Sequence, residues 1–140
     1  MSYEVWGEPD DDYMTAEQAV DNGWLSPDSY SKGAMDVLNE RVRHESEEGW
    51  TPAHDDNHTE GELARAGGCY AIAAGIQALT SKPGENVAAP PAGVWPWHPD
   101  WWKPRSAREN LVRAASLLIA EIDRLDRAEA AAKTEERHGV

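Results

Sequence analysis

The sequence predicts an all-α fold: a compact bundle of three main helices plus a short N-terminal helix, with a long ordered loop rich in Trp and Pro. Apolar residues recur every three or four positions in several segments, which is the period of an amphipathic helix. Capping motifs precede three of these segments, and no segment has a convincing strand pattern. With 140 residues, the chain is expected to form a single helical domain over residues 1–128.

A short helix is predicted near the N-terminus. Thr15–Gln18 matches a capping box, in which two side chains cap each other's backbone, and Gly23 follows as a stop signal. Residues 16–22 are therefore expected to be helical. The acidic residues 1–13 before them are expected to be flexible.

The first main helix is predicted to follow Ser26, a capping residue placed directly before Pro27. Apolar residues at helical spacing then continue to Val42. Gly33 disfavours the first turn, which moves the expected start toward residue 33. Gly49 is expected to end this helix.

The second main helix is predicted to open at another capping box, Thr59–Glu62, and to end at Pro83 and Gly84. Its pattern is apolar on two sides and rich in Ala and Gly, so it is expected to be central and closely packed. Cys69, the only cysteine, is expected to be a small core residue of this helix.

Residues 81–104 contain six of the nine prolines and four tryptophans, which predicts an ordered loop and not a plain linker. Ser106–Glu109 is a third capping box and opens the last main helix. Apolar residues with 3-4 spacing along it predict a seam that packs on another helix. They are Leu111, Ala115, Leu118, Ile122 and Leu125. Residues 129–140 are expected to be a polar, frayed tail.

Charge and composition limit the function. The chain has 26 acidic and 13 basic residues, a formal net charge of −13, so direct nucleic-acid binding is not expected. No apolar run is long enough to cross a membrane, and the N-terminus does not resemble a signal peptide. A single cysteine suits a reducing cytoplasm, so a cytoplasmic protein is expected.

The acidic segment 46–62 is the strongest candidate for a metal site. His54 and His58 match the spacing of a zinc hydrolase motif, but Pro52 and the acidic residues between them disfavour the continuous helix that such a motif needs. Oxygen donors suit Mg²⁺ or Mn²⁺ better. The candidate metal residues are Asp55, Asp56, His58, Glu62 and Glu121. The alternative is that Glu62 caps a helix and Glu121 pairs with a nearby arginine.

The aromatic loop is a candidate ligand site, because its rings could stack a base while neighbouring cations contact phosphate. The candidate ligand-binding residues are His54, Trp95, Trp97, Trp102, Lys103 and Arg108. The alternative is that these rings hold the loop against a helical core. Trp50 is expected to belong to the same cluster.

Several stretches together resemble a family of small proteins encoded by tailed phages and prophages. They include Glu48–His58, Gly61–Ala64, Trp95–Trp97, Trp101–Pro104 and Ala120–Arg127. The resemblance covers roughly residues 38–128 and implies a phage-linked protein of the host cell cytoplasm, but no defined activity. A looser likeness to helical nucleotide pyrophosphohydrolases of the MazG type lacks their Glu-Glu-x-x-Glu signature.

Two functions follow as hypotheses. In the first, the protein is a non-catalytic phage accessory protein that antagonises a host protein or sequesters a nucleotide signal. In the alternative, it is a Mg²⁺- or Mn²⁺-dependent nucleoside triphosphate pyrophosphohydrolase. The incomplete signature favours the first. The apolar seam at residues 111–125 also leaves a homodimer open.

Overall fold

The computed structural model describes residues 15–23, 26–80 and 87–139. The described residues are helical or irregular and include no strand, which confirms the all-α prediction. The chain divides into two compact units, Met1–Ala34 and Met35–Val140, where the sequence predicts one domain over residues 1–128.

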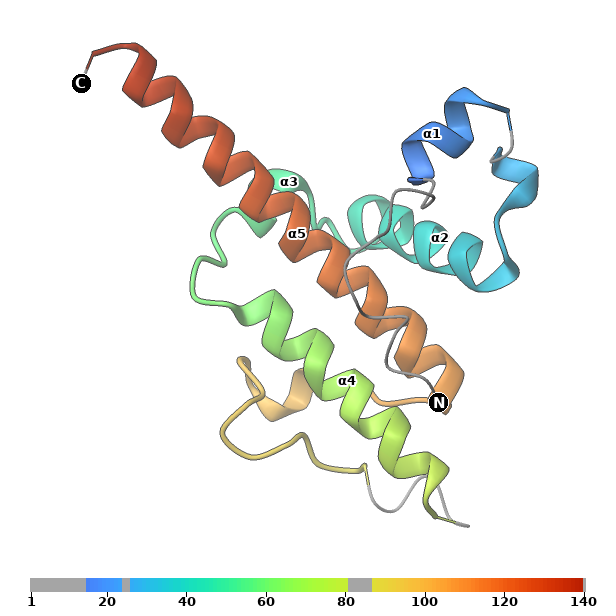
Figure 1. The fold of residues 1–140 in the computed structure, drawn as a ribbon. Helices are drawn as coiled ribbons and strands as arrows, with labels where there is room; N and C mark the ends of the chain where they lie inside the picture. Colours follow the sequence, from blue (N-terminus) through green and yellow to red (C-terminus); the bar gives the residue numbers. More distant parts are fainter. Residues whose placement is uncertain (1–14, 24–25, 81–86, 140) are drawn as a thin grey trace, which may run out of the picture. The chain divides into compact units, whose positions relative to one another are not determined.

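The first unit contains the helix α1 (Ala16–Asp21) (Figure 1). Its predicted capping box is confirmed, because Gln18 N donates to Thr15 Oγ1 at 3.1 Å and Thr15 N donates to Gln18 Oε1 at 2.8 Å. After Ser26 the chain forms only a 3₁₀ turn, η2 (Pro27–Ser29), and not the start of a long helix. The expected acidic segment 1–13 lies outside the described residues.

The helix α2 (Lys32–Ser46) begins in the first unit and runs into the second. Its start at Lys32 is close to the position that Gly33 indicated. It ends before Gly49, which has a φ of +73° and turns the chain toward the short helix α3 (Pro52–Asp55). The sequence predicts a non-helical turn at α3. Thr51 nevertheless caps this single helical turn, and Pro52 suits its first position.

The second unit is built on the helices α4 (Glu62–Ala78) and α5 (Ala107–Arg137), which lie side by side (Figure 1). The capping box predicted at the start of α4 is wrong. Gly61, with a φ of +78°, is the N-cap residue and makes no side-chain cap. Glu62 Oε1 instead accepts from Glu60 N at 2.6 Å. The left-handed turn at Gly61 thus separates Thr59 from the first helical turn.

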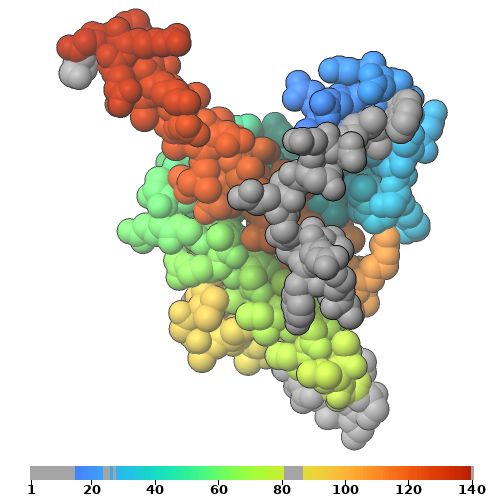
Figure 2. Space-filling model, viewed as in Figure 1, coloured from blue at the N-terminus to red at the C-terminus, as the bar shows by residue number. Residues whose placement is uncertain are grey.

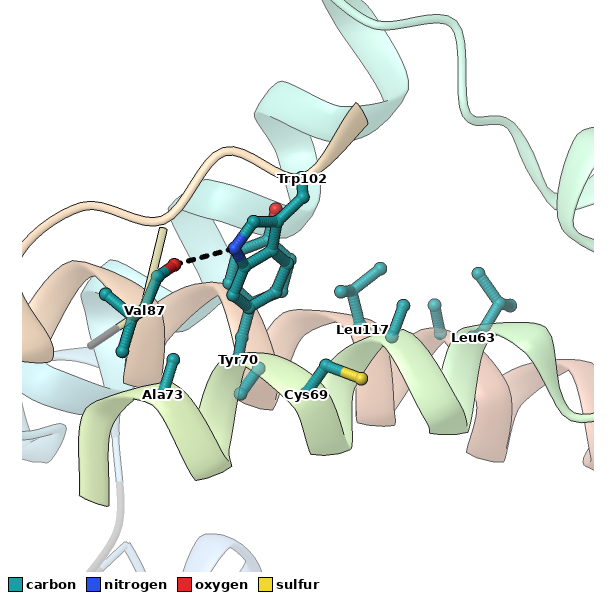
Figure 3. Packing of buried hydrophobic residues seen from close by; sticks show 10 residues of the cluster. Leu63, Cys69, Tyr70, Ala73, Val87, Trp102 and Leu117 are labelled. Carbon is teal, nitrogen blue, oxygen red and sulfur yellow. Dashed lines mark hydrogen bonds between the residues drawn. The ribbon is translucent and has the colours of Figure 1, made fainter. Parts of the chain in front are cut away.

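The core lies between α4, α5 and the aromatic loop, whose described part is residues 87–104 and is called the Trp loop below. On the surface this loop (yellow) lies against α4 (green) in Figure 2. Trp102 fixes this loop: its ring stacks on Tyr70 with centroids 4.6 Å apart, and its Nε1 donates to Val87 O at 2.8 Å (Figure 3). Cys69 is fully buried in the same cluster, and burial raises the pKa of its thiol. The expectation that Cys69 is a core residue is confirmed.

The predicted seam on α5 does not face the core. Leu111, Leu118, Ile122 and Leu125 are exposed. The face that packs inward carries Asn110, Ala114, Leu117, Glu121 and Arg124. This face is polar at several positions, but its polar groups are satisfied locally. Arg124 Nε donates to Glu121 Oε1, for example, so their burial leaves no unpaired charge.

Asn110 joins α5 to α4 and to the end of the Trp loop. Its Nδ2 donates to Gln77 Oε1 at 2.9 Å, and its Oδ1 accepts from Arg105 N at 2.8 Å. Gln77 Nε2 also donates to Arg105 O at 2.7 Å. Buried amides with all these partners fix the register of the three elements.

The helix α5 begins after Ser106, as predicted, with the Ser106 side chain accepting from Glu109 N at 3.2 Å. The other half of the predicted capping box is absent, because Glu109 Oε1 accepts from the Ser106 hydroxyl at 3.1 Å and not from its backbone N–H. It continues to Arg137, past residue 128 where the sequence predicts a frayed tail. The tail is rich in Ala, Glu, Lys and Arg, which favour helix, and Lys133 pairs with Glu129 at 3.0 Å. Local propensity therefore extends the helix beyond its tertiary contacts.

Glycines on α4 provide a test of the helix packing. A Cβ at Gly67 would lie 3.1 Å from both Ala114 O and Leu118 Cδ2, whereas Gly68 and Gly75 have nothing within 4 Å. We expect Gly68→Ala and Gly75→Ala each to raise the free energy of unfolding by about 0.5–1 kcal/mol through helix propensity. Gly67→Ala should lower it, because the α5 backbone must move. Urea denaturation measures all three, and an equal gain at Gly67 would contradict the close approach.

Candidate functional site

The main cavity of the second unit has a volume of about 600 Å³ and lies among α2, α4, α5 and the Trp loop. Its walls include the rings of Trp50, Tyr70, Trp95, Trp97 and Trp101. Charged side chains complete the walls: Glu40, Arg43, Glu48, Lys103, Arg105, Glu109 and Arg113. The site therefore combines flat apolar surfaces with groups of both charges.

An unbroken row of ring contacts joins α2 to the Trp loop. The rings are, in order, His44, Trp50, His54, His58, Trp97 and Trp95, with neighbouring centroids 4.6, 6.2, 5.0, 5.7 and 5.4 Å apart. Trp50 and Trp97 thus pack into one aromatic system, as the sequence predicts for Trp50. The two histidines of the acidic segment serve as links between tryptophans. Such ring pairs add stability beyond their buried area and hold the cavity wall in place.

His44 is the most unusual group in the cavity wall. Its side chain is 1 % exposed, and among the described residues neither of its ring nitrogens has a hydrogen-bond partner. Nε2 lies 2.9 Å from Glu40 Oε1, but without the alignment of a hydrogen bond. Burial lowers the pKa of His44, so the ring is neutral near pH 7. A neutral imidazole has one N–H donor and one acceptor nitrogen, and both nitrogens of His44 are buried.

The cations of the wall differ in how strongly they are held. Arg43 is fully engaged, because its guanidinium donates to Glu40 at 2.6 Å and to Glu48 at 2.8 Å. Arg113 donates to Lys103 O at 2.6 Å and lies 5.0 Å above the Tyr70 ring. Lys103 makes no ion pair with any carboxylate in the described part of the chain.

Arg105 is held only weakly. Its guanidinium lies 3.9 Å from the Glu109 carboxylate, and both side chains are mostly exposed, so this ion pair is weak. Lys103 and Arg105 are therefore the cations of the wall most available to an anion.

The carboxylates of the acidic segment are already paired and point to different partners. Asp55 is buried between Arg41 and His54, at 3.9 and 3.2 Å. Asp56 pairs with Arg127 on α5 at 2.8 Å. The structure therefore uses these two carboxylates to attach α3 to its neighbours.

The remaining candidate metal residues form two separate pairs, His58 with Glu62 at 3.1 Å and Glu121 with Arg124. Burial alone would raise the pKa of Glu62, but hydrogen bonds from backbone N–H groups and from His58 hold it below its usual value. No three His, Cys, Asp or Glu side chains of the described residues form a group suited to a metal ion. The predicted cluster for Mg²⁺ or Mn²⁺ is thus not brought together.

The predicted ligand-binding residues divide into two groups. Trp95, Trp97 and Lys103 line the cavity. The other three are not part of its lining: Trp102 packs in the core, Arg108 pairs with Asp36 at 2.9 Å, and His54 stacks on Trp50. The wall residues His44, Tyr70 and Arg113 are not among the residues predicted from the sequence. For His44 the sequence signal is indirect, since its four-residue spacing from Glu40 predicts contact between the two side chains but not burial.

A second, smaller cavity of about 290 Å³ shares three of these aromatic walls, Trp50, Trp97 and Trp101. Leu63 and His98 complete its lining. It is the more apolar of the two sites.

Comparison of the chain with protein-family models, with curated proteins and with solved structures finds no match. None of the helices in the described part of the chain combines the length and the hydrophobicity that a membrane span requires.

The buried imidazole predicts a specific pH dependence. Because the pKa of folded His44 lies below the ordinary value of about 6.5, the unfolded chain takes up this proton first as pH falls. Folding stability should decrease as the pH drops from about 6.5 toward 5, and the stability of His44→Gln should vary less in that window. Urea midpoints between pH 5 and 8 measure this.

Two features separate this effect from others. Glu40 and Glu62, whose pKa values are lowered, lose their stabilising charge only at lower pH. His98→Gln, which removes a solvent-exposed imidazole, is the matched control. Equal pH slopes for the wild type and His44→Gln would show that this imidazole is not held neutral by burial.

Proposed function

We propose that the protein is a non-catalytic binding protein whose main cavity holds a nucleotide, consistent with the expected role of sequestering a nucleotide signal. The observation that carries the proposal is the composition of the wall: exposed faces of tryptophan beside two weakly held cations. Base-aromatic stacking and phosphate-cation contacts are the two interactions by which proteins bind nucleotides without a metal.

Trp101 is the ring best suited to stack a base. It is 67 % exposed and lines both cavities, so a ligand can cover it without disturbing the core. Lys103 follows two residues later and extends the same wall. A phosphate held by Lys103 and Arg105 would lie beside a base that covers Trp101.

His44 belongs to the cavity lining but is not accessible from it. Its side chain is 1 % exposed, and its Nε2 lies 2.9 Å from Glu40 Oε1. The proposed contacts with base and phosphate therefore depend on Trp101, Lys103 and Arg105, which are exposed.

The paired carboxylates support binding over hydrolysis. A metal-dependent hydrolase needs several carboxylates that face one ion. In the described residues each candidate carboxylate is already paired with a His or Arg side chain, and no group of three could hold a metal ion. The pyrophosphohydrolase alternative has no observation in its favour here. The phage origin and the antagonism of a host protein likewise stay predictions.

Binding can be measured by isothermal titration calorimetry with a panel of linear and cyclic ribonucleotides. We expect at least one nucleotide to bind the wild type and to raise its thermal midpoint, because a ligand specific to the folded state stabilises it. Trp101→Ala should weaken binding roughly 5- to 150-fold, the equivalent of about 1–3 kcal/mol for one stacked base. Its unfolding should stay close to that of the wild type, since Trp101 is exposed.

Two lysine variants distinguish binding in the cavity from attraction of the nucleotide by the overall charge of the protein. Lys103→Ala should weaken binding about tenfold, whereas Lys133→Ala removes the same charge from the exposed end of α5 and should have no effect. Equal losses from both variants would indicate attraction by overall charge and not a site. The absence of binding by any nucleotide at millimolar concentration would refute the proposal.

A further inference from the structure

A row of large apolar side chains lies exposed along α5, on the side that the sequence predicts to pack on another helix. Leu111, Leu118, Ile122 and Leu125 are 52, 41, 57 and 53 % exposed, and Ala115 lies half-buried among them. These five residues are called the α5 stripe. Contiguous apolar patches of this kind on a protein surface mark interaction sites.

We propose that the α5 stripe is the docking site for a second copy of this chain, in a two-fold symmetric, antiparallel dimer centred on Leu118. This inference is independent of the nucleotide site, since no residue of the stripe lines the main cavity. The stripe has the 3-4 spacing of a helix-helix seam, which lets side chains of one helix fit between those of another. A two-fold dimer buries one such patch against itself.

The stripe is self-complementary in the antiparallel direction. With Leu118 on the two-fold axis, Leu111 of one copy faces Leu125 of the other, and Ala115 faces Ile122. The small Ala115 thus meets the large Ile122, and Leu111 and Leu125, near the two ends of the seam, meet each other. Alternation of small and large side chains across an interface favours close packing.

Charges at the ends of the seam select this direction. Continuing the same spacing by one step places Arg108 at one end and Glu129 at the other, and both side chains are largely exposed. In the antiparallel dimer each Arg108 faces Glu129 of the second copy. In a parallel dimer Arg108 would face Arg108 and Glu129 would face Glu129, which is unfavourable.

Neither end charge must give up its present partner. Arg108 pairs with Asp36 at 2.9 Å, and Glu129 pairs with Lys133 at 3.0 Å. Because a guanidinium has five donors and a carboxylate accepts several hydrogen bonds, each can add a contact with the second copy. The antiparallel dimer can therefore form the contact between Arg108 and Glu129 while both ion pairs of the single chain remain.

One end of the Leu118 side chain rests on α4, where a Cβ added at Gly67 would lie 3.1 Å from Leu118 Cδ2. The rest of this side chain is free to contact a second copy, because Leu118 is still 41 % exposed. The stripe is thus both apolar and accessible.

Cysteine cross-linking tests the dimer and its register. In a Cys69→Ser background, Leu118→Cys should form a covalent dimer on mild oxidation, because the two introduced thiols meet at the axis. Leu111→Cys alone should not cross-link, but a mixture of Leu111→Cys and Leu125→Cys proteins should. Cross-linking of Leu111→Cys alone would indicate a parallel dimer and overturn the proposed register.

Light scattering after size-exclusion chromatography tests the oligomeric state itself. The full-length wild type should elute as a dimer, and Ile122→Lys should be a monomer that keeps its helical circular dichroism. Val42→Lys places the same charge on an exposed apolar residue of α2 and should remain dimeric. A monomeric wild type at 100 μM, or a dimeric Ile122→Lys, would overturn the proposal.

Discussion

The close approach of α4 and α5 at Gly67 is the contact on which the rest of the second unit depends. A Cβ at this position would lie 3.1 Å from Ala114 O and from Leu118 Cδ2, which is tighter than ordinary contact, so these neighbours would have to shift. Farther along the same two helices, Gln77 of α4 accepts a hydrogen bond from Asn110 of α5, which fixes the register of the helices and the position of Tyr70. The Trp loop is fastened to that register at two positions, by the stack of Trp102 on Tyr70 and by the hydrogen bonds of Arg105.

The Trp loop illustrates how one aromatic segment supports both stability and a candidate site. Trp102 is directed into the core and holds the loop in place. Trp95 and Trp97 pack partly on the core and partly line the cavity, whereas Trp101 is left on the surface. The two interpretations of these rings, stacking on a ligand and holding the loop against the core, therefore apply to different tryptophans of the same loop.

The sequence was sufficient for features set by local interactions. The all-α class and the caps at Thr15 and Ser106 depend on residues within a few positions of each other, and the structure has them. The cap at Thr59 failed because Gly61 takes a left-handed conformation that the side-chain pattern does not reveal. The 3-4 pattern on α5 correctly indicated a helix but not which face is buried, since Asn110 and Glu121 are buried with partners from the fold.

The candidate site was less predictable, because it too depends on contacts between residues that are far apart in the sequence. The row of acidic residues after Gly49 suggested a common ligand, yet Asp55 and Asp56 are paired with arginines of α2 and α5 that are distant in sequence. His44 could not be selected, because its burial arises only when Trp50 packs on it and the Trp loop closes the cavity. Tertiary contacts thus decide which titratable groups are left for a ligand.

The burial of Cys69 has a practical consequence. The thiol is held inside the cluster that joins α4 to the Trp loop, and burial disfavours its reactive thiolate form. A thiol reagent can reach it only when α4 separates from its neighbours. The rate of labelling therefore measures how often the core opens and is insensitive to motion of the exposed helix ends. The chain thus carries, in its single cysteine, an intrinsic probe of how often its central contact breaks.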